Sequence, residues 1–131
     1  MKISVEHIGL PARNAAALRD WYVTKLGAEC IAPTGDEPPF FLRPPGSVAM
    51  FEIYHATSSN PVTEDNWLAG WRHLALRVDS LEAARVELES HGVTFIEPVK
   101  PAAGGGRILF FKDCEGNLLH LVDRPADTKG R

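Results

Sequence analysis

Apolar residues along this chain follow two spacings, one typical of strands and one typical of helices. Alternating apolar and polar positions or short apolar runs predict strands. They occur at residues 3–10, 28–33, 39–43, 48–54, 72–78, 93–97, 107–112 and 118–123. After the first strand of each half, apolar residues recur every three or four positions, which predicts an amphipathic helix. The apolar faces consist of Leu18, Trp21, Tyr22 and Leu26 in the first helix and Leu81, Ala84 and Leu88 in the second.

Each predicted helix has a polar start and a glycine after its end. These residues are Asn14 and Gly27 for the first helix and Asp79-Ser80 and Gly92 for the second. Glycine is favoured just past a helix because it adopts the left-handed conformation without strain. Asp79 with Glu82 three positions on resembles a capping box. We therefore expect both helices to be well delimited.

The order of these elements repeats within the chain. A shift of 66 residues superposes four identities and a shift of 65 superposes three more, which are His7/His73, Leu10/Leu76, Ala17/Ala83, Arg19/Arg85, Gly27/Gly92, Ile31/Ile96 and Pro33/Pro98. We predict an α+β fold in which two βαβββ modules form a curled eight-stranded mixed sheet. The modules span 3–54 and 72–123, joined by a linker at 55–71 and followed by a frayed tail at 124–131.

Strand alternation places four ligand-type side chains at matching positions of the two modules. His7 and His73 lie in the first strands, on the face opposite the helix. Glu52 and His120 interrupt the apolar last strands "VAMFEIY" and "NLLHLVD". Imidazole and carboxylate are the usual ligands of divalent first-row metals. The quartet therefore predicts one metal site.

Each member of this quartet has a simpler explanation when it is taken alone. A single histidine in a strand is more often structural than a ligand. Glu52 could pair with Arg72 or Arg77, because a buried carboxylate without a partner costs several kcal/mol. A closed four-ligand shell would also be typical of a structural zinc site rather than a catalytic one. Recurrence at pseudo-symmetric positions favours the metal site.

Composition and charge narrow the class of protein. The 131 residues suffice for one domain, and the net charge of −3 with no run of Lys and Arg gives no footprint for nucleic acid. No stretch has the apolar length of a membrane span or a signal peptide, and two cysteines do not make a disulfide framework. Residues 102–108 are glycine-rich but precede a strand, which argues against a phosphate loop. We expect a cytoplasmic protein that binds neither nucleic acid nor membranes.

The chain resembles the vicinal oxygen chelate superfamily, which includes glyoxalase I, methylmalonyl-CoA epimerase, extradiol dioxygenases and bleomycin-binding proteins. The resemblance covers about residues 3–123 and is carried by "EHIGLPARN", "LRDWYVTKLGAE", "MFEIY", "WRHLALRVDSLEAA" and "FFKDCEGNLLHLVD". It implies a homodimer and eight strands curled around a metal-binding cleft. It also implies a divalent ion (Fe, Mn, Ni, Co or Zn) held at the positions of His7, Glu52, His73 and His120.

One position departs from the pattern of many enzymes in that family, which carry glutamate where this chain has His120. With three neutral imidazoles and one carboxylate, a divalent ion would keep a net charge of +1, which favours an enolate or catecholate. His120 would be a weak base once it is bound to metal, so Glu52 remains the catalytic carboxylate. The departure counts against glyoxalase I itself and against standard extradiol cleavage.

We therefore expect a divalent-metal-dependent enzyme that polarises vicinal oxygens of a small substrate, of lyase, isomerase or dioxygenase type. The alternative is a non-catalytic small-molecule or drug-binding protein of the bleomycin-resistance kind. The expected substrate contacts are Arg77, Tyr54, Trp71 and Met50. Trp71 and its neighbour Trp67 have a second interpretation as packing residues where the modules join.

Overall fold

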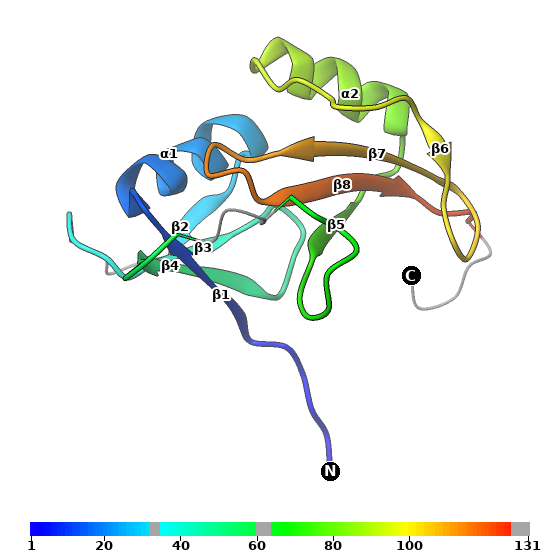
Figure 1. Cartoon of the computed structure of the whole chain (residues 1–131). Coiled ribbons are helices and arrows are strands. Elements are labelled where there is room, and N and C mark those ends of the chain that lie inside the picture. The colour runs from blue at the N-terminus through cyan, green and yellow to red at the C-terminus, as the bar shows by residue number, and fades with distance from the viewer. Residues whose placement is uncertain (32–34, 60–63, 127–131) are drawn as a thin grey trace. The chain divides into compact units, whose positions relative to one another are not determined.

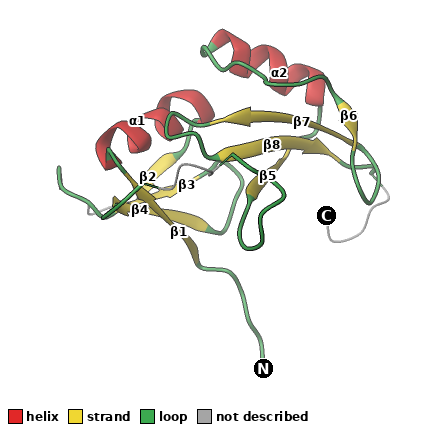
Figure 2. Cartoon of the chain, in the orientation of Figure 1, coloured by secondary structure: helices red, strands yellow, loops and turns green. Residues whose placement is uncertain are grey.

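The element order βαβββ occurs twice in the computed structural model of this protein (Figure 1). The chain divides into unit 1, Met1–Pro61, and unit 2, Val62–Arg131, and the structure describes residues 1–31, 35–59 and 64–126. Over these residues each unit has one helix and one four-stranded mixed sheet (Figure 2). The predicted α+β fold of two βαβββ modules is confirmed, with the eight strands divided equally between two sheets.

Unit 1 consists of β1 (His7–Ala12), α1 (Ala15–Leu26), β2 (Glu29–Ile31), β3 (Phe40–Arg43) and β4 (Met50–His55). The strand order is β1-β4-β3-β2, and β1 pairs in parallel with β4 while the other pairs are antiparallel. The helix begins where the side chain of Asn14 accepts a hydrogen bond from the backbone of Ala17, and it ends at Gly27 with φ 69°. Both boundaries agree with the sequence signals.

Unit 2 repeats the arrangement with β5 (His73–Arg77), α2 (Leu81–Ser90), β6 (Lys100–Pro101), β7 (Arg107–Lys112) and β8 (Leu118–Asp123). Its order is β5-β8-β7-β6, again with one parallel pair, β5 with β8. The helix packs on β7 and β8 through Leu81 and Leu88, which are buried. The core includes Leu109, Phe111, Leu119 and Leu121, each at most 2% exposed.

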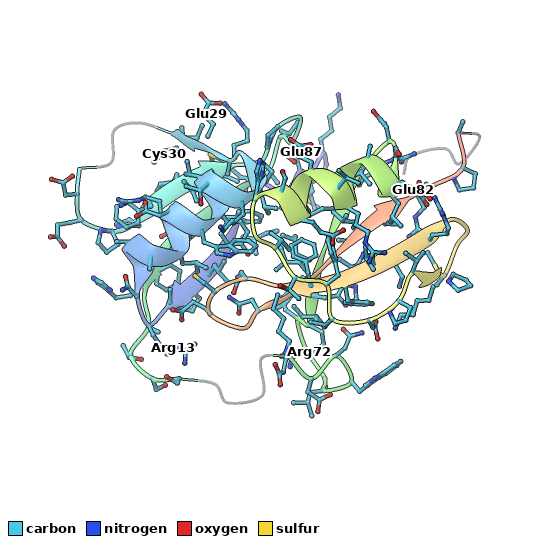
Figure 3. All side chains as sticks on the ribbon, turned by 90° about the horizontal axis from the view of Figure 1, so that it is seen from above. Arg13, Glu29, Cys30, Arg72, Glu82 and Glu87 are labelled. Atoms are coloured by element: carbon cyan, nitrogen blue, oxygen red, sulfur yellow. The ribbon has the colours of Figure 1, made fainter. Side chains whose placement is uncertain are left out.

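The predicted capping box at the start of α2 is wrong. Ser80 is the capping residue, and its hydroxyl accepts a hydrogen bond from the backbone of Ala83 at 3.2 Å. Glu82, labelled in Figure 3, does not close a box with Asp79 but accepts two hydrogen bonds from Arg107 of β7. A bidentate bond to a guanidinium is stronger than a bond to one backbone N–H, so the ion pair determines where Glu82 points.

Two further strand predictions need correction. Residues 93–97 form only an isolated bridge between Phe95 and Phe111, and the two-residue strand β6 follows at Lys100–Pro101. The first strand begins at His7, and residues 3–6 before it are not part of the sheet. Of the tail predicted to fray, residues 127–131 lie outside the described ranges, while Arg124 donates to the carbonyls of Ala103 and Gly105.

Neither α1 nor α2, the helices of the described ranges, is long and apolar enough to cross a membrane.

Candidate functional site

In unit 1 the two predicted ligands lie in direct contact. His7 begins β1 and Glu52 lies at the middle of β4, its parallel neighbour. The His7 Nε2 atom is 3.0 Å from Glu52 Oε2. Phe41, the partner of Glu52 on β3, presents its ring edge-on to His7, with ring centroids 6.0 Å apart. A polar contact therefore joins His7 to Glu52, and the Phe41 ring borders the His7 side chain.

The missing side chain of Gly9 makes room for a tyrosine beside this pair. Gly9 faces Glu52 across β1 and β4, two residues beyond His7. A Cβ atom added at Gly9 would lie 3.3 Å from the hydroxyl and 3.4 Å from the ring of Tyr54. Strand alternation puts Tyr54 on the same face as Glu52, so its phenol group lies next to the ligand pair.

In unit 2 the two predicted ligands form the equivalent pair. His73 on β5 and His120 on β8 have ring centroids 4.8 Å apart. Phe110, the partner of His120 on β7, lies edge-on to both rings, at 5.8 Å from His73 and 4.9 Å from His120. His120 is 5% exposed, which makes it one of the few buried polar residues of the described chain.

The three histidines of the quartet each contact a hydrogen-bond acceptor through Nδ1. His7 Nδ1 lies 2.8 Å from Glu6 Oε2, His73 Nδ1 lies 2.6 Å from Asn66 Oδ1, and His120 Nδ1 lies 3.1 Å from the carbonyl of Leu121. Carboxylate, amide and carbonyl oxygens only accept hydrogen bonds, so each Nδ1 carries the proton. In the neutral rings Nε2 then keeps its lone pair, which is the arrangement that metal-binding histidines use.

The two units give their histidines different proton affinities. The hydrogen bond from Glu6 raises the pKa of His7, and the charge of Glu52 adds to the effect. Burial lowers the pKa of His120, and partial desolvation against Phe110 lowers that of His73. Near neutral pH the unit 2 pair is therefore uncharged, whereas His7 holds its second proton more firmly.

The structure thus brings the predicted quartet together as two pairs, one in each unit. Glu52 has an ion-pair partner in His7, so no pairing with Arg72 or Arg77 is needed to account for its charge. Among the described residues, no group of three or more His, Cys, Asp or Glu side chains is placed to hold a metal ion. The donor chemistry of each pair fits a divalent ion.

The predicted substrate contacts lie on the strands that carry these pairs or, for Trp71, just before such a strand. Met50 is the β1–β4 partner of His7, and Tyr54 lies over Gly9. Arg77 lies on β5 and shares the face of His73 by alternation. Trp71 precedes β5 and is 99% exposed, so no described residue of unit 2 packs over it.

Four residues around the pairs were not predicted from the sequence. Phe41 and Phe110 are 69 residues apart on equivalent strands, so extending the repeat alignment to the third strand of each module would have found them. Glu6 directly precedes His7, so the sequence alone places a carboxylate next to this histidine. Asn66 lies in a loop seven residues before His73, and no sequence pattern marks it.

Comparison with known proteins gives the same fold. The antibiotic-binding protein TnmS3 from Streptomyces sp. CB03234 superposes with a TM-score of 0.70 at 25% identity, over 95% of this chain and 99% of that chain. A glyoxalase family protein from Enterococcus faecalis superposes with a TM-score of 0.71 at 25% identity, over 91% and 96%. A superfamily member from Sphaerobacter thermophilus gives 0.70 at 22% identity, over 94% and 98%. No curated protein matches significantly.

The family model of the Glyoxalase/Bleomycin resistance protein/Dioxygenase superfamily matches residues 4–121, which include both modules and all four predicted ligands. This match agrees with the repeated βαβββ order and with the equivalent side-chain pairs on β1–β4 and β5–β8. The chain therefore belongs to the Glyoxalase/Bleomycin resistance protein/Dioxygenase superfamily.

Proposed function

We propose that this protein is a divalent-metal-dependent enzyme that polarises vicinal oxygens of a small substrate, in lyase, isomerase or dioxygenase chemistry. The proposed ligands are His7, Glu52, His73 and His120, and the ion is Fe, Mn, Ni, Co or Zn. The observation that carries the proposal is that all three histidines use Nδ1 for a hydrogen bond to an oxygen. The Nε2 lone pair can then bind an ion in His73 and His120, and in His7 once the proton it shares with Glu52 leaves.

The spacing of the donor atoms in unit 1 supports the proposal. Two ligands of one ion would have to lie side by side, as these two do. The His7 Nε2 to Glu52 Oε2 distance is 3.0 Å. Without metal, a shared proton accounts for this contact. Metal binding would require that proton to leave, and Glu6 would then stabilise the metal-bound imidazole.

The side chains around the ligands would bind and orient the substrate. When bound, the ion would act as a Lewis acid toward substrate oxygens. Glu52 is the one carboxylate of the quartet and the proposed catalytic base. The phenol of Tyr54 would donate a hydrogen bond to a substrate oxygen, and Arg77 would stabilise developing negative charge. Met50 and Trp71 would supply apolar contact.

A second candidate function is binding without catalysis. TnmS3 is described as an antibiotic-binding protein and is 25% identical to this chain. Trp67 and Trp71 are 91% and 99% exposed in the loop before β5, and aromatic side chains at that exposure suit an apolar or aromatic ligand. The intact ligand quartet favours the enzyme over this alternative.

Metal content separates the two functions. We expect purified wild-type protein to bind about one equivalent of a divalent ion, measured by elemental analysis after growth with each candidate metal. His73→Ala and His120→Ala should each lose most of it, because each removes one of four ligands. His55→Ala is the matched control, since His55 is an exposed residue of β4 outside the quartet. It should retain wild-type loading.

Wild-type protein that takes up none of the five metals would overturn the enzyme proposal and favour the binding protein. Equal loading of His73→Ala, His55→Ala and wild type would place the metal elsewhere. With the metal identified, iron would direct substrate trials toward dioxygenase chemistry, and the other four toward lyase or isomerase chemistry.

We also propose that the protein works as a homodimer in the cytoplasm. Dimers are common in the superfamily, and Cys30 and Cys114 are not joined by a disulfide in the described part of the chain. Light scattering during gel filtration would measure the oligomeric state, and cell fractionation the location.

A further inference from the structure

The two histidines that begin β1 and β5 obtain their Nδ1 acceptors from different places. In unit 1 the acceptor is Glu6, the residue directly before His7. The repeat offset of 66 puts Arg72 at that position in unit 2. A guanidinium has donors only, so Arg72 cannot accept the proton of His73 Nδ1. The second module therefore needs an acceptor from outside its strand.

Asn66 supplies that acceptor from the loop before β5. Its Oδ1 atom lies 2.6 Å from His73 Nδ1, a short hydrogen bond across seven residues of chain. Arg72, labelled in Figure 3, instead donates to the carbonyl of Asp65 at 3.4 Å. The side chain of Asp65 accepts from the backbone N–H of Trp67 at 3.0 Å. Asn66 is thus flanked by residues that have hydrogen bonds of their own.

A further contact anchors the start of the same loop. Glu64 pairs with Lys112 of β7, the strand that also carries Phe110. The loop at 64–72 is therefore attached to the rest of unit 2 by two side-chain contacts, one to Lys112 of β7 and one to His73 of β5. The last of these attachments is the one that touches a proposed metal ligand.

We propose that Asn66 is a positioning residue that holds His73 in the tautomer with an unprotonated Nε2, and that it thereby sets the metal affinity of the unit 2 pair. The inference rests on the proposed function, because it assigns a role to the partner of a proposed ligand. Without this acceptor the His73 ring would be free to rotate or to carry its proton on Nε2, where the ion must bind.

The hydrogen bond between Asn66 and His73 also connects His73 to the loop that carries the exposed tryptophans. Trp67 follows Asn66 directly, and Trp71 lies two residues before His73, so the loop that contacts the ligand also carries the most exposed aromatic surface of unit 2. Loss of the bond should make the fluorescence of this loop insensitive to metal binding.

Two substitutions of Asn66 test the proposal through metal affinity. Asn66→Leu keeps the size of the side chain but removes the acceptor, and we expect its dissociation constant for Zn²⁺ to rise about 10- to 100-fold, the usual effect of losing such a partner. Asn66→Asp keeps an acceptor and should remain within a few-fold of wild type. Competition with a chromophoric chelator measures the constants.

Glu64→Gln is the control for loosening of the loop, because it weakens the anchor on β7 without touching His73. We expect it to bind Zn²⁺ as tightly as wild type. An equal loss in Glu64→Gln and Asn66→Leu would overturn the positioning role, since general loop mobility would then explain both results. Unchanged affinity in Asn66→Leu would overturn it as well.

The tautomer itself gives a readout that does not depend on metal. In metal-free wild-type protein, the ¹⁵N chemical shifts of His73 should show a protonated Nδ1 and an unprotonated Nε2 above its pKa, and Asn66→Leu should shift the proton toward Nε2. If the wild type binds no metal but Asn66→Leu still shifts the proton of His73 toward Nε2, the proposed function is refuted, while the effect of Asn66 on the tautomer stands. Wild-type metal binding with no tautomer change would refute the role of Asn66 alone.

Discussion

Gly106 lies where β7 begins, against the end of β8, and the structure leaves no room there for a side chain. Its φ is 92°, and an added Cβ atom would lie 1.8 Å from the carbonyl oxygen of Asp123 and 3.2 Å from the Cα atom of Arg124. Both contacts are with backbone atoms, which cannot rotate away. The substitution Gly106→Ala should therefore separate the ends of these two strands.

The size of this effect follows from two contributions. The positive φ costs an alanine about 1–2 kcal/mol. Moving Asp123 away also weakens its hydrogen bonds from Arg107, one to Oδ1 at 3.0 Å and one to Oδ2 at 2.7 Å, at about 1 kcal/mol each. We expect Gly106→Ala to lower the free energy of unfolding by about 3–4 kcal/mol.

Gly46→Ala is the matched control, because Gly46 has a φ of 76° but no atom within 4 Å of an added Cβ. Gly46→Ala should lower the free energy of unfolding by only about 1–2 kcal/mol, because the positive φ is the only contribution at this position. Urea unfolding followed by circular dichroism measures both variants. Equal losses for the two glycines would refute the close approach of β7 to β8 on which the larger figure depends.

Two other predictions concern α2. Ser80→Ala should lower the free energy of unfolding by about 1 kcal/mol because it removes the helix cap. Asp79→Ala should change that free energy by less than about 0.5 kcal/mol. Thermal unfolding of the two variants tests Ser80 as the cap, and a larger loss for Asp79→Ala would support the capping box instead. Hydrogen bonding to Arg107 lowers the pKa of Glu82 below its usual 4.5, so Glu82 contributes stability above pH 4.5 that is lost as the pH falls through the lowered value. Wild type should thus exceed Glu82→Gln in stability at about pH 7 and lose that advantage toward about pH 3 in urea titrations; a difference independent of pH would contradict the ion pair.

The sequence predicted those elements whose signals are local. Strands β7 and β8 were predicted at their observed bounds, because each is a short, mostly apolar run and a turn separates them. The repeat placed His7, Glu52, His73 and His120 on matching strands, and the structure confirms the two pairs within their units. Periodicity and internal symmetry are therefore enough to find side chains that lie together on neighbouring strands.

The features that the sequence did not predict depend on tertiary contacts. Strand β6 has two residues and no apolar pattern, and it exists because Lys100 and Pro101 pair with β7. Residues 93–97 have a strand-like pattern, but only Phe95 pairs, with Phe111. The bond from His73 to Asn66 joins a strand to a loop without periodicity. Such contacts are chosen by packing and by the need for acceptors, neither of which leaves a spacing in the sequence.

The placement of His7 and His73 on β1 and β5 has a consequence for local opening. In the sheets formed by the described residues, each is an outer strand with a hydrogen-bonded neighbour on one side only. Outer strands are the first parts of a sheet to fray, and amide hydrogen exchange registers that opening. Because Glu52 and His120, the other two proposed ligands, lie on the adjacent inner strands, an ion bound by either pair would connect the two strands of that unit. Metal loading and the protection of these outer strands from exchange would then be two measures of one equilibrium.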